Sequence, residues 1–172
     1  MVLKVGGNDL DDPAFLQALA GYLATPPAPV ILVHGGGKEI GTLQARLGIA
    51  PRWVDGLRVT DEDTLAVVEM VLCGRVNTRL VRQLIAAGID AQGMSGADRG
   101  LLRAAKLVHP GGDLGRVGAI TAVRGDALAA MLAQGITPVI APLALGDDGE
   151  MYNVNADHAA AAVAQAVGAG RI

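Results

Sequence analysis

The sequence of 172 residues has one cysteine, little net charge and no long hydrophobic run, and each shortage excludes a class of protein. A single cysteine, Cys73, cannot form a disulfide framework within the chain. The apolar residues before it, Met70 to Leu72, predict a small buried thiol, because a reactive cysteine needs an electropositive and partly exposed setting. A net charge of −3 offers no general basic surface for DNA or RNA, so we expect no nucleic-acid partner.

The chain also lacks the features of a membrane, secreted or metal-binding protein. No apolar run approaches the roughly 20 residues of a membrane-spanning helix. Met1 leads directly into an apolar run without a basic leader, so we expect a cytoplasmic protein with no membrane partner. The three histidines, His34, His109 and His158, are scattered and have no companions at ligand spacing, so we predict no metal site.

The sequence is rich in hydrophobic residues, which make up 51% of it, enough for the core of one domain. Apolar runs alternate with helical patterns, which indicates an α/β fold: a mainly parallel, open sheet sandwiched by helices, with β-hairpin insertions. We predict strands over residues 2–6, 29–34, 89–94, 101–108, 117–123 and 136–141, and helices over 12–24, 37–47, 61–87, 125–134 and 156–167.

Local signals set several of these boundaries. Asp12 and Pro13 suit an N-cap and first helical position, and Gly48 suits a helix end. The pair Asp55-Gly56 between short apolar runs predicts a hairpin turn. The long helix after Thr60 is apolar on more than one side, so we expect it to contact two neighbours, and we expect a bend at its glycine, Gly74.

Three separated segments predict an anion-binding site. Gly6 and Gly7 follow the first strand, Gly35 to Gly37 follow the second, and Asn153 to Asp157 open the last helix. Glycine lets backbone N–H groups approach a ligand without a Cβ in the way, and in parallel sheets ligands bind beyond the carboxyl ends of strands. Lys4 adds a mobile positive charge to the same place.

Four ordered motifs carry a resemblance. The segments Lys4 to Gly7, His34 to Gly37, Asp55 to Asp61 and Asn153 to Asp157 resemble the successive signatures of the acetylglutamate kinases, a branch of the amino acid kinase family. The resemblance implies transfer of the γ-phosphoryl group of ATP, with Mg²⁺, to the side-chain carboxylate of N-acetyl-L-glutamate in arginine biosynthesis. It covers the N-terminal two-thirds of such an enzyme, residues 1–172 being the acylamino-acid-binding and catalytic lobe. The ATP-binding lobe lies outside this chain, so we expect the chain alone to be inactive.

The resemblance also implies roles for single residues. Lys4 would stabilise the transferring phosphoryl group, Gly6 and Gly7 would hold nucleotide phosphate, and Asp157 would hold the catalytic lysine in place. The loose transition state of phosphoryl transfer calls for such charge stabilisation more than for a base. Each residue has a plainer interpretation: Lys4 as an edge-strand lysine, and Asp157 as an acidic residue in a first helical turn.

On the acceptor side, the resemblance implies that Gly35, Gly36, Arg58 and Asn153 bind acetylglutamate, with Arg58 gripping its α-carboxylate as a bidentate fork. The plainer alternatives are an exposed arginine paired with Asp55 or Asp61, and asparagines that only cap the last helix.

The sequence leaves other functions open. A related kinase acts on carrier-linked aminoadipate in lysine biosynthesis, although the segment from Gly56 to Asp61 fits the acetylglutamate version better. A fragment that binds an acylated amino acid without phosphorylating it is a second alternative. A dinucleotide-dependent oxidoreductase is a third, disfavoured because Gly35 to Gly37 do not continue as Gly-x-Gly-x-x-Gly. In the family a long helix pairs two subunits, so we expect a homodimer.

Overall fold

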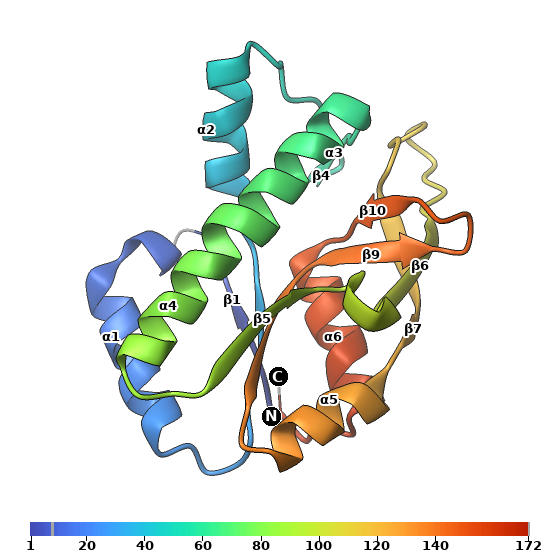
Figure 1. The fold of residues 1–172 in the computed structure, drawn as a ribbon. Coiled ribbons are helices and arrows are strands. Elements are labelled where there is room, and N and C mark those ends of the chain that lie inside the picture. Colours follow the sequence, from blue (N-terminus) through green and yellow to red (C-terminus); the bar gives the residue numbers. More distant parts are fainter. Residues whose placement is uncertain (8, 172) are drawn as a thin grey trace.

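The computed structural model describes residues 1–7 and 9–171 and is built around a four-stranded parallel sheet (Figure 1). The strand order is β1 (Val2–Val5), β2 (Ile31–His34), β8 (Thr137–Ala141), β5 (Ala91–Ser95), and every pairing is parallel. All four strands therefore end at the same edge of the sheet, and their carboxyl ends lie beside one another. The predicted α/β fold with a parallel sheet is confirmed.

Helices cover both faces of this sheet, and the alternation of side chains along β2 explains how. Leu32 packs into a core with the helices of one face, whereas Ile31 and Val33 pack into a second core on the other face. The first core holds α1 (Pro13–Ala24), α2 (Gly37–Leu47), α3 (Glu62–Glu69), the π-helix η2 (Met70–Asn77) and α4 (Thr78–Ala86). The second holds α5 (Gly125–Ala133) and α6 (Ala156–Ala166).

A second, mixed sheet stands beside the first and was only partly predicted. Its order is β10 (Met151–Asn153), β9 (Leu143–Gly146), β6 (Leu102–Lys106), β7 (Gly118–Val123). The sequence indicated β6 and β7, but not β9 and β10. These two strands are short, and their positions depend on the parallel pairing of β9 with β6, which is remote in sequence.

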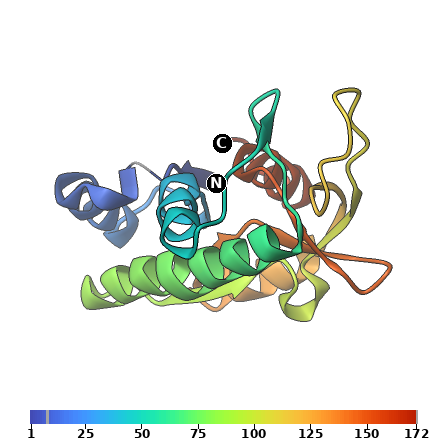
Figure 2. The same cartoon turned by 90° about the horizontal axis from the view of Figure 1, so that it is seen from above.

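The predicted hairpin, β3 (Trp53–Val54) and β4 (Leu57–Arg58), is present as a separate two-stranded sheet. Asp55 and Gly56 have φ angles of 47° and 78°, as a type I′ turn requires. Figure 2 shows the hairpin projecting on the same side as the loop between β6 and β7. A small apolar cluster that includes Val59, Leu114 and Val117 joins the bases of the two.

The helix ends follow the predicted signals. The Asp12 carboxylate accepts a hydrogen bond from the Ala14 N–H at 2.9 Å, and Gly48 ends α2 with a φ of 72°. The predicted long helix is continuous, since α3, η2 and α4 run on from one another, and Gly74, where we expected a bend, lies within the π-helical turns of η2. The 3₁₀ turns η1 (Asp9–Asp11) and η3 (Asp98–Gly100) were not predicted.

Across the described residues, no helix combines the length and the apolar character needed to cross a bilayer.

Candidate active site

The candidate site lies where β1, β2 and β8 end, because the glycine loops follow two of these strands. Along β1, Val5 packs into the core on the α1 side, so the neighbouring Lys4 points to the opposite side, toward α6. The Lys4 Nζ lies 3.1 Å from Oδ1 of Asp157, in the first turn of α6. Both side chains are partly open to solvent, with 32% and 66% of their surface exposed. The structure thus brings together the predicted lysine and carboxylate.

The two glycine loops touch each other. The Gly35 N–H donates to the Val5 carbonyl at 2.9 Å, and a Cβ on Gly7 would lie only 3.2 Å from Cα of Gly36. A Cβ on Gly36 itself would come within 2.6 Å of Leu72 in η2. Close packing thus leaves no room for a Cβ at Gly36 unless the Leu72 side chain shifts.

The loop after β2 leads into an uncapped helix. Gly36 is the N-cap of α2 and provides no side-chain hydrogen bond. The first N–H groups of a helix have no partners within it, and the helix dipole favours an anion there. The N-terminus of α2 can therefore bind phosphate or carboxylate oxygens.

A cavity of about 190 Å³ opens beside these loops, between the hairpin and the start of α6. Its lining includes Gly35 to Gly37, Trp53, Arg58, Asn153 and Ala156. The cavity therefore joins all four acceptor-side residues predicted from the sequence, from segments that are far apart in the chain.

Arg58 is buried in the wall of this cavity, with only 8% of its surface exposed. Its Nη2 donates to the Gly37 carbonyl at 3.1 Å, its Nη1 donates to Oε1 of Gln44, and its guanidinium lies 4.3 Å above the centre of the Trp53 ring. Burial lowers the pKa of Arg58, yet arginine stays charged at neutral pH. Asp61 pairs with Arg52 instead, so the interpretation of Arg58 as an exposed surface-paired residue is wrong.

The two asparagines before α6 have different positions. The Asn155 side chain caps the helix, accepting from the N–H groups of Asp157 and His158 at 2.8 and 3.2 Å. Asn153 instead donates through Nδ2 to the Thr60 hydroxyl at 3.1 Å, and that hydroxyl donates to the Arg58 carbonyl at 3.0 Å. Asn153 therefore ties the wall of the cavity to the strand that carries Arg58.

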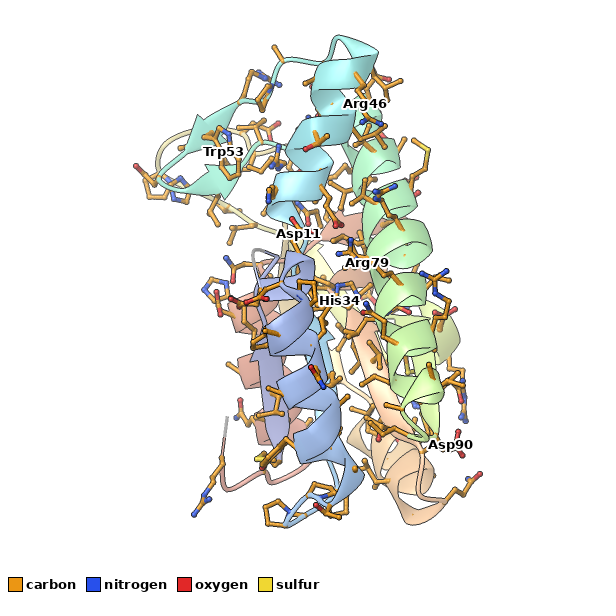
Figure 3. All side chains as sticks on the ribbon, turned by 90° about the vertical axis from the view of Figure 1, so that its left-hand side faces the viewer. Asp11, His34, Arg46, Trp53, Arg79 and Asp90 are labelled. Atoms are coloured by element: carbon orange, nitrogen blue, oxygen red, sulfur yellow. The ribbon has the colours of Figure 1, made fainter. Side chains whose placement is uncertain are left out.

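His34, at the end of β2, supports the glycine loop that follows it, and the sequence did not predict this role. It is fully buried, and its Nδ1 lies 3.0 Å from the Gly35 carbonyl (Figure 3). Asn77 in η2 donates through Nδ2 to the Val139 carbonyl at 2.9 Å and lies 3.0 Å from Nε2 of His34. Because an amide nitrogen can only donate, Nε2 is the acceptor and Nδ1 carries the proton.

Burial lowers the pKa of His34 to about 4, with a further lowering by the nearby positive charge of Arg79, so the ring is neutral at physiological pH. The sequence held one signal for this pair: Asn77 is a polar residue within the apolar pattern of the long helix. Cys73, also in η2, is half-buried, and burial raises its pKa to about 11, so its thiol is not activated.

A larger hollow, of about 290 Å³, lies between α2, η1 and the long helix, and its charges are mostly paired with one another. Arg79 lies 2.6 Å from Glu39, and Lys38 lies 2.7 Å from Asp11 (Figure 3 labels Arg79 and Asp11). Within the described residues, no group of three or more histidine, cysteine or carboxylate side chains is placed to hold a metal ion.

Known proteins resemble this chain over its whole length. The sequence profile described as the Amino acid kinase family matches residues 1–172. Among curated relatives, the acetylglutamate kinase of Roseiflexus sp. (strain RS-1) is 62% identical over 168 residues, which is 98% of this chain and 64% of the relative. That of Methanopyrus kandleri is 50% identical over 175 residues, covering 99% of this chain and 68% of the relative. The chain thus spans about two-thirds of the length of such relatives.

Solved structures show the same arrangement. The protein smu.665 of Streptococcus mutans UA159 matches with a TM-score of 0.87 at 28% identity, over 97% of this chain and 68% of that one. An N-acetylglutamate synthase of Neisseria gonorrhoeae, in complex with coenzyme A and N-acetylglutamate, matches with a TM-score of 0.81 at 28% identity, over 96% of this chain and 38% of that one.

Proposed function

The chain belongs to the amino acid kinase family, and on that premise we propose that it is the acceptor-binding lobe of an acetylglutamate kinase, which transfers the γ-phosphoryl group of ATP to the side-chain carboxylate of N-acetyl-L-glutamate. The observation that carries the proposal is Arg58: a buried cation in the wall of a cavity, beside two glycine loops. A planar guanidinium binds a carboxylate through two parallel hydrogen bonds. Because the relatives are named acetylglutamate kinases, the proposal places this reaction in arginine biosynthesis.

The chemistry needs alignment and charge stabilisation more than a base. The acceptor carboxylate is already ionised at neutral pH, and the transition state spreads negative charge over the phosphoryl oxygens. We assign the stabilisation of this negative charge to Lys4, whose Nζ lies 3.1 Å from Asp157, and to the amides of Gly6 and Gly7. The amide of Gly36, at the uncapped start of α2, is assigned to acceptor oxygens, whereas the Gly35 amide already donates to the Val5 carbonyl and Gly35 only lines the cavity.

Of the two substrates, the nucleotide is the one to which this chain contributes fewer binding groups. We propose that the ATP-binding lobe lies in the third of the relatives that the chain does not cover. Mg²⁺ would be held mainly by the phosphates of ATP, as is usual for this ion. A phosphate-binding loop without that lobe gives weak binding, because orientation of the donor depends on closure of both lobes.

Isothermal titration of the chain with acetylglutamate and with Mg-ATP tests the proposal. We expect measurable acetylglutamate binding, weak Mg-ATP binding and no turnover by the chain alone. Turnover is expected when the remaining third of the Roseiflexus relative is fused after residue 172. A folded chain that binds no acetylglutamate would refute the acceptor site, and full turnover by the chain alone would refute the division into lobes. Binding without turnover in the fusion would favour a non-catalytic binding protein.

We further propose that a second copy of the chain packs against the long helix. Met70 in η2 and Ile85 in α4 have 54% and 56% of their surface exposed, which is unusual for large apolar side chains. Beside this helix, β5 lies at the edge of the parallel sheet. A two-fold pairing would cover both features. Light scattering should give twice the chain mass, and Met70→Glu should shift the mass toward a monomer. A monomeric wild-type chain would contradict the pairing.

A further inference from the structure

One side chain behind the wall of the acceptor cavity, in contact with Arg58, is unusual for its environment. Gln44 lies on α2 with no exposed surface, one turn after Ile40, the other buried side chain of that helix. Burying a side-chain amide is unfavourable unless its polar atoms are hydrogen-bonded. A leucine or methionine would fill the same space without that cost, so the polar amide needs an explanation.

Both ends of the Gln44 amide are used. Its Oε1 accepts from Nη1 of Arg58, and its Nε2 donates to the hydroxyl of Thr64 at 3.2 Å. Because arginine has only donors, the amide oxygen must face Arg58, and the orientation of the amide follows from chemistry. Thr64, in α3, is itself 3% exposed, so the chain of contacts from Thr64 through Gln44 to Arg58 is shielded from water.

Gln44 is one of three restraints on the guanidinium. The Gly37 carbonyl accepts from Nη2 at 3.1 Å, and the Trp53 ring covers one face at 4.3 Å. Arginine has five N–H donors, and the described residues use two of them, which leaves others for a ligand. Every one of these partners is uncharged. The guanidinium is therefore held in a fixed direction while its positive charge is left uncompensated.

From this we propose that Gln44 is a positioning residue: it fixes the direction of Arg58 and, being neutral, preserves the charge with which Arg58 selects a carboxylate. The inference rests on the proposed function, in which Arg58 binds the α-carboxylate of acetylglutamate. A glutamate at this position would accept the same hydrogen bond but would compete with the ligand for the charge of Arg58. The amide gives the geometry of an acceptor without that competition.

The test measures a ratio of two affinities. N-acetyl-L-isoglutamine carries an amide in place of the α-carboxylate of acetylglutamate and is otherwise the same compound. Competition titrations on the 172-residue chain give the dissociation constants of both. We expect the wild-type chain to prefer acetylglutamate at least tenfold. Gln44→Glu should lower that preference by roughly tenfold, because the new charge competes with the ligand for Arg58. Gln44→Met should lower it by roughly threefold, because only the hydrogen bond that directs one N–H group of Arg58 is lost.

Matched variants separate positioning from damage to the fold. Gln44→Met keeps the volume of the side chain, and Thr64→Val removes only the hydroxyl that holds the amide; both should lower the preference. Gln17→Glu, on an exposed glutamine of α1, should leave it unchanged. A merely structural role would weaken both compounds equally and keep the ratio, which would overturn the inference. If the wild-type chain binds neither compound, the proposed function fails instead.

Discussion

Arg58 and Lys4 are the two cations of the candidate site, and they are held in opposite ways. Arg58 is 8% exposed and has two neutral acceptors and an aromatic ring around it. Lys4 has 32% of its side chain exposed and, among the described residues, one partner, the carboxylate of Asp157 at 3.1 Å. The acceptor side is thus rigid before any ligand arrives, whereas the phosphoryl side keeps a long side chain that can move. This difference suits a site in which Arg58 orients the acceptor first and the Lys4 side chain then moves to stabilise the negative charge of the transferring phosphoryl group.

The same contrast separates the floor of the site from its opening. His34 and Asn77 are buried, uncharged and mutually hydrogen-bonded beneath the glycine loop. Asp157 is two-thirds exposed. Changes in pH and single substitutions should therefore act differently on the two sides.

The largest effect is expected from acidification, which should lower stability through the buried His34. The pKa of His34 is lowered from 6.5 to about 4, so between these values the unfolded chain binds a proton that the folded chain does not. The contribution of His34 to stability should be full above pH 6.5, fall as the pH drops toward 4 and level off below, by about 3 kcal/mol in all. Urea unfolding at a series of pH values measures this. His34→Gln should remove most of the fall, and the exposed-site control His158→Gln should not; equal curves for both variants would place the acid sensitivity elsewhere.

On the exposed side of the site, Lys4→Ala should lower turnover without weakening the binding of acetylglutamate. In the fusion described above we expect kcat to fall roughly 100-fold, with KM for acetylglutamate changed less than about twofold, because the lysine acts mainly in the transition state. Lys106→Ala, which breaks another exposed lysine–aspartate pair, with Asp113 at 2.9 Å, is the control. A near-normal kcat in Lys4→Ala would remove this residue from the catalytic set.

Arg58→Lys should do the reverse and weaken acetylglutamate binding by roughly tenfold, with a smaller effect on kcat, because lysine keeps the charge but lacks the planar fork. Titration calorimetry gives the dissociation constant. Arg52→Lys is the matched control, since Arg52 precedes the hairpin and pairs with Asp61 on the surface at 3.4 Å. Unchanged affinity in Arg58→Gln would mean that the buried arginine only supports the fold.

The smallest effect is expected from Asp157→Asn on stability. The ion pair with Lys4 is largely open to water, and such pairs contribute about 0–1 kcal/mol. Denaturant titration should show a loss within that range, which shrinks further when salt is added. A loss of several kcal/mol would contradict the picture of a loosely held pair.

The parts of the site that the sequence predicted are those with short-range signals. Strand ends followed by glycines placed Gly7 and Gly36 correctly at one edge of the sheet, and the spacing Asp55-Gly56 predicted the hairpin. Parallel strands place their carboxyl ends together whatever their order. The meeting of Lys4 with Asp157 came from the family resemblance instead, because α6 follows β10 of the second sheet.

What could not be predicted depends on docking between distant segments. The burial of Arg58 requires the hairpin to pack on α2, where Gln44 lies 14 residues earlier in the chain. The contact between His34 and Asn77 spans 43 residues, and the pairing of β9 with β6 about as many. A polar residue within an apolar pattern marks such positions as unusual, but it does not name their partners.

The π-helical turns of η2 have a consequence for the angular phase of the long helix. One row of its buried residues recurs every fourth position: Thr64, Val68, Leu72, Val76, Leu80, Leu84. On a regular α-helix a four-residue repeat drifts by about 40° per turn, or about 200° over the five steps, so the stripe would wind to the opposite side. Wider turns between Met70 and Asn77 take back part of this drift. The π-helical segment thereby keeps one row of side chains facing α2 at the start of the long helix and the parallel sheet further along. Deleting a single residue there would turn Asn77 away from His34.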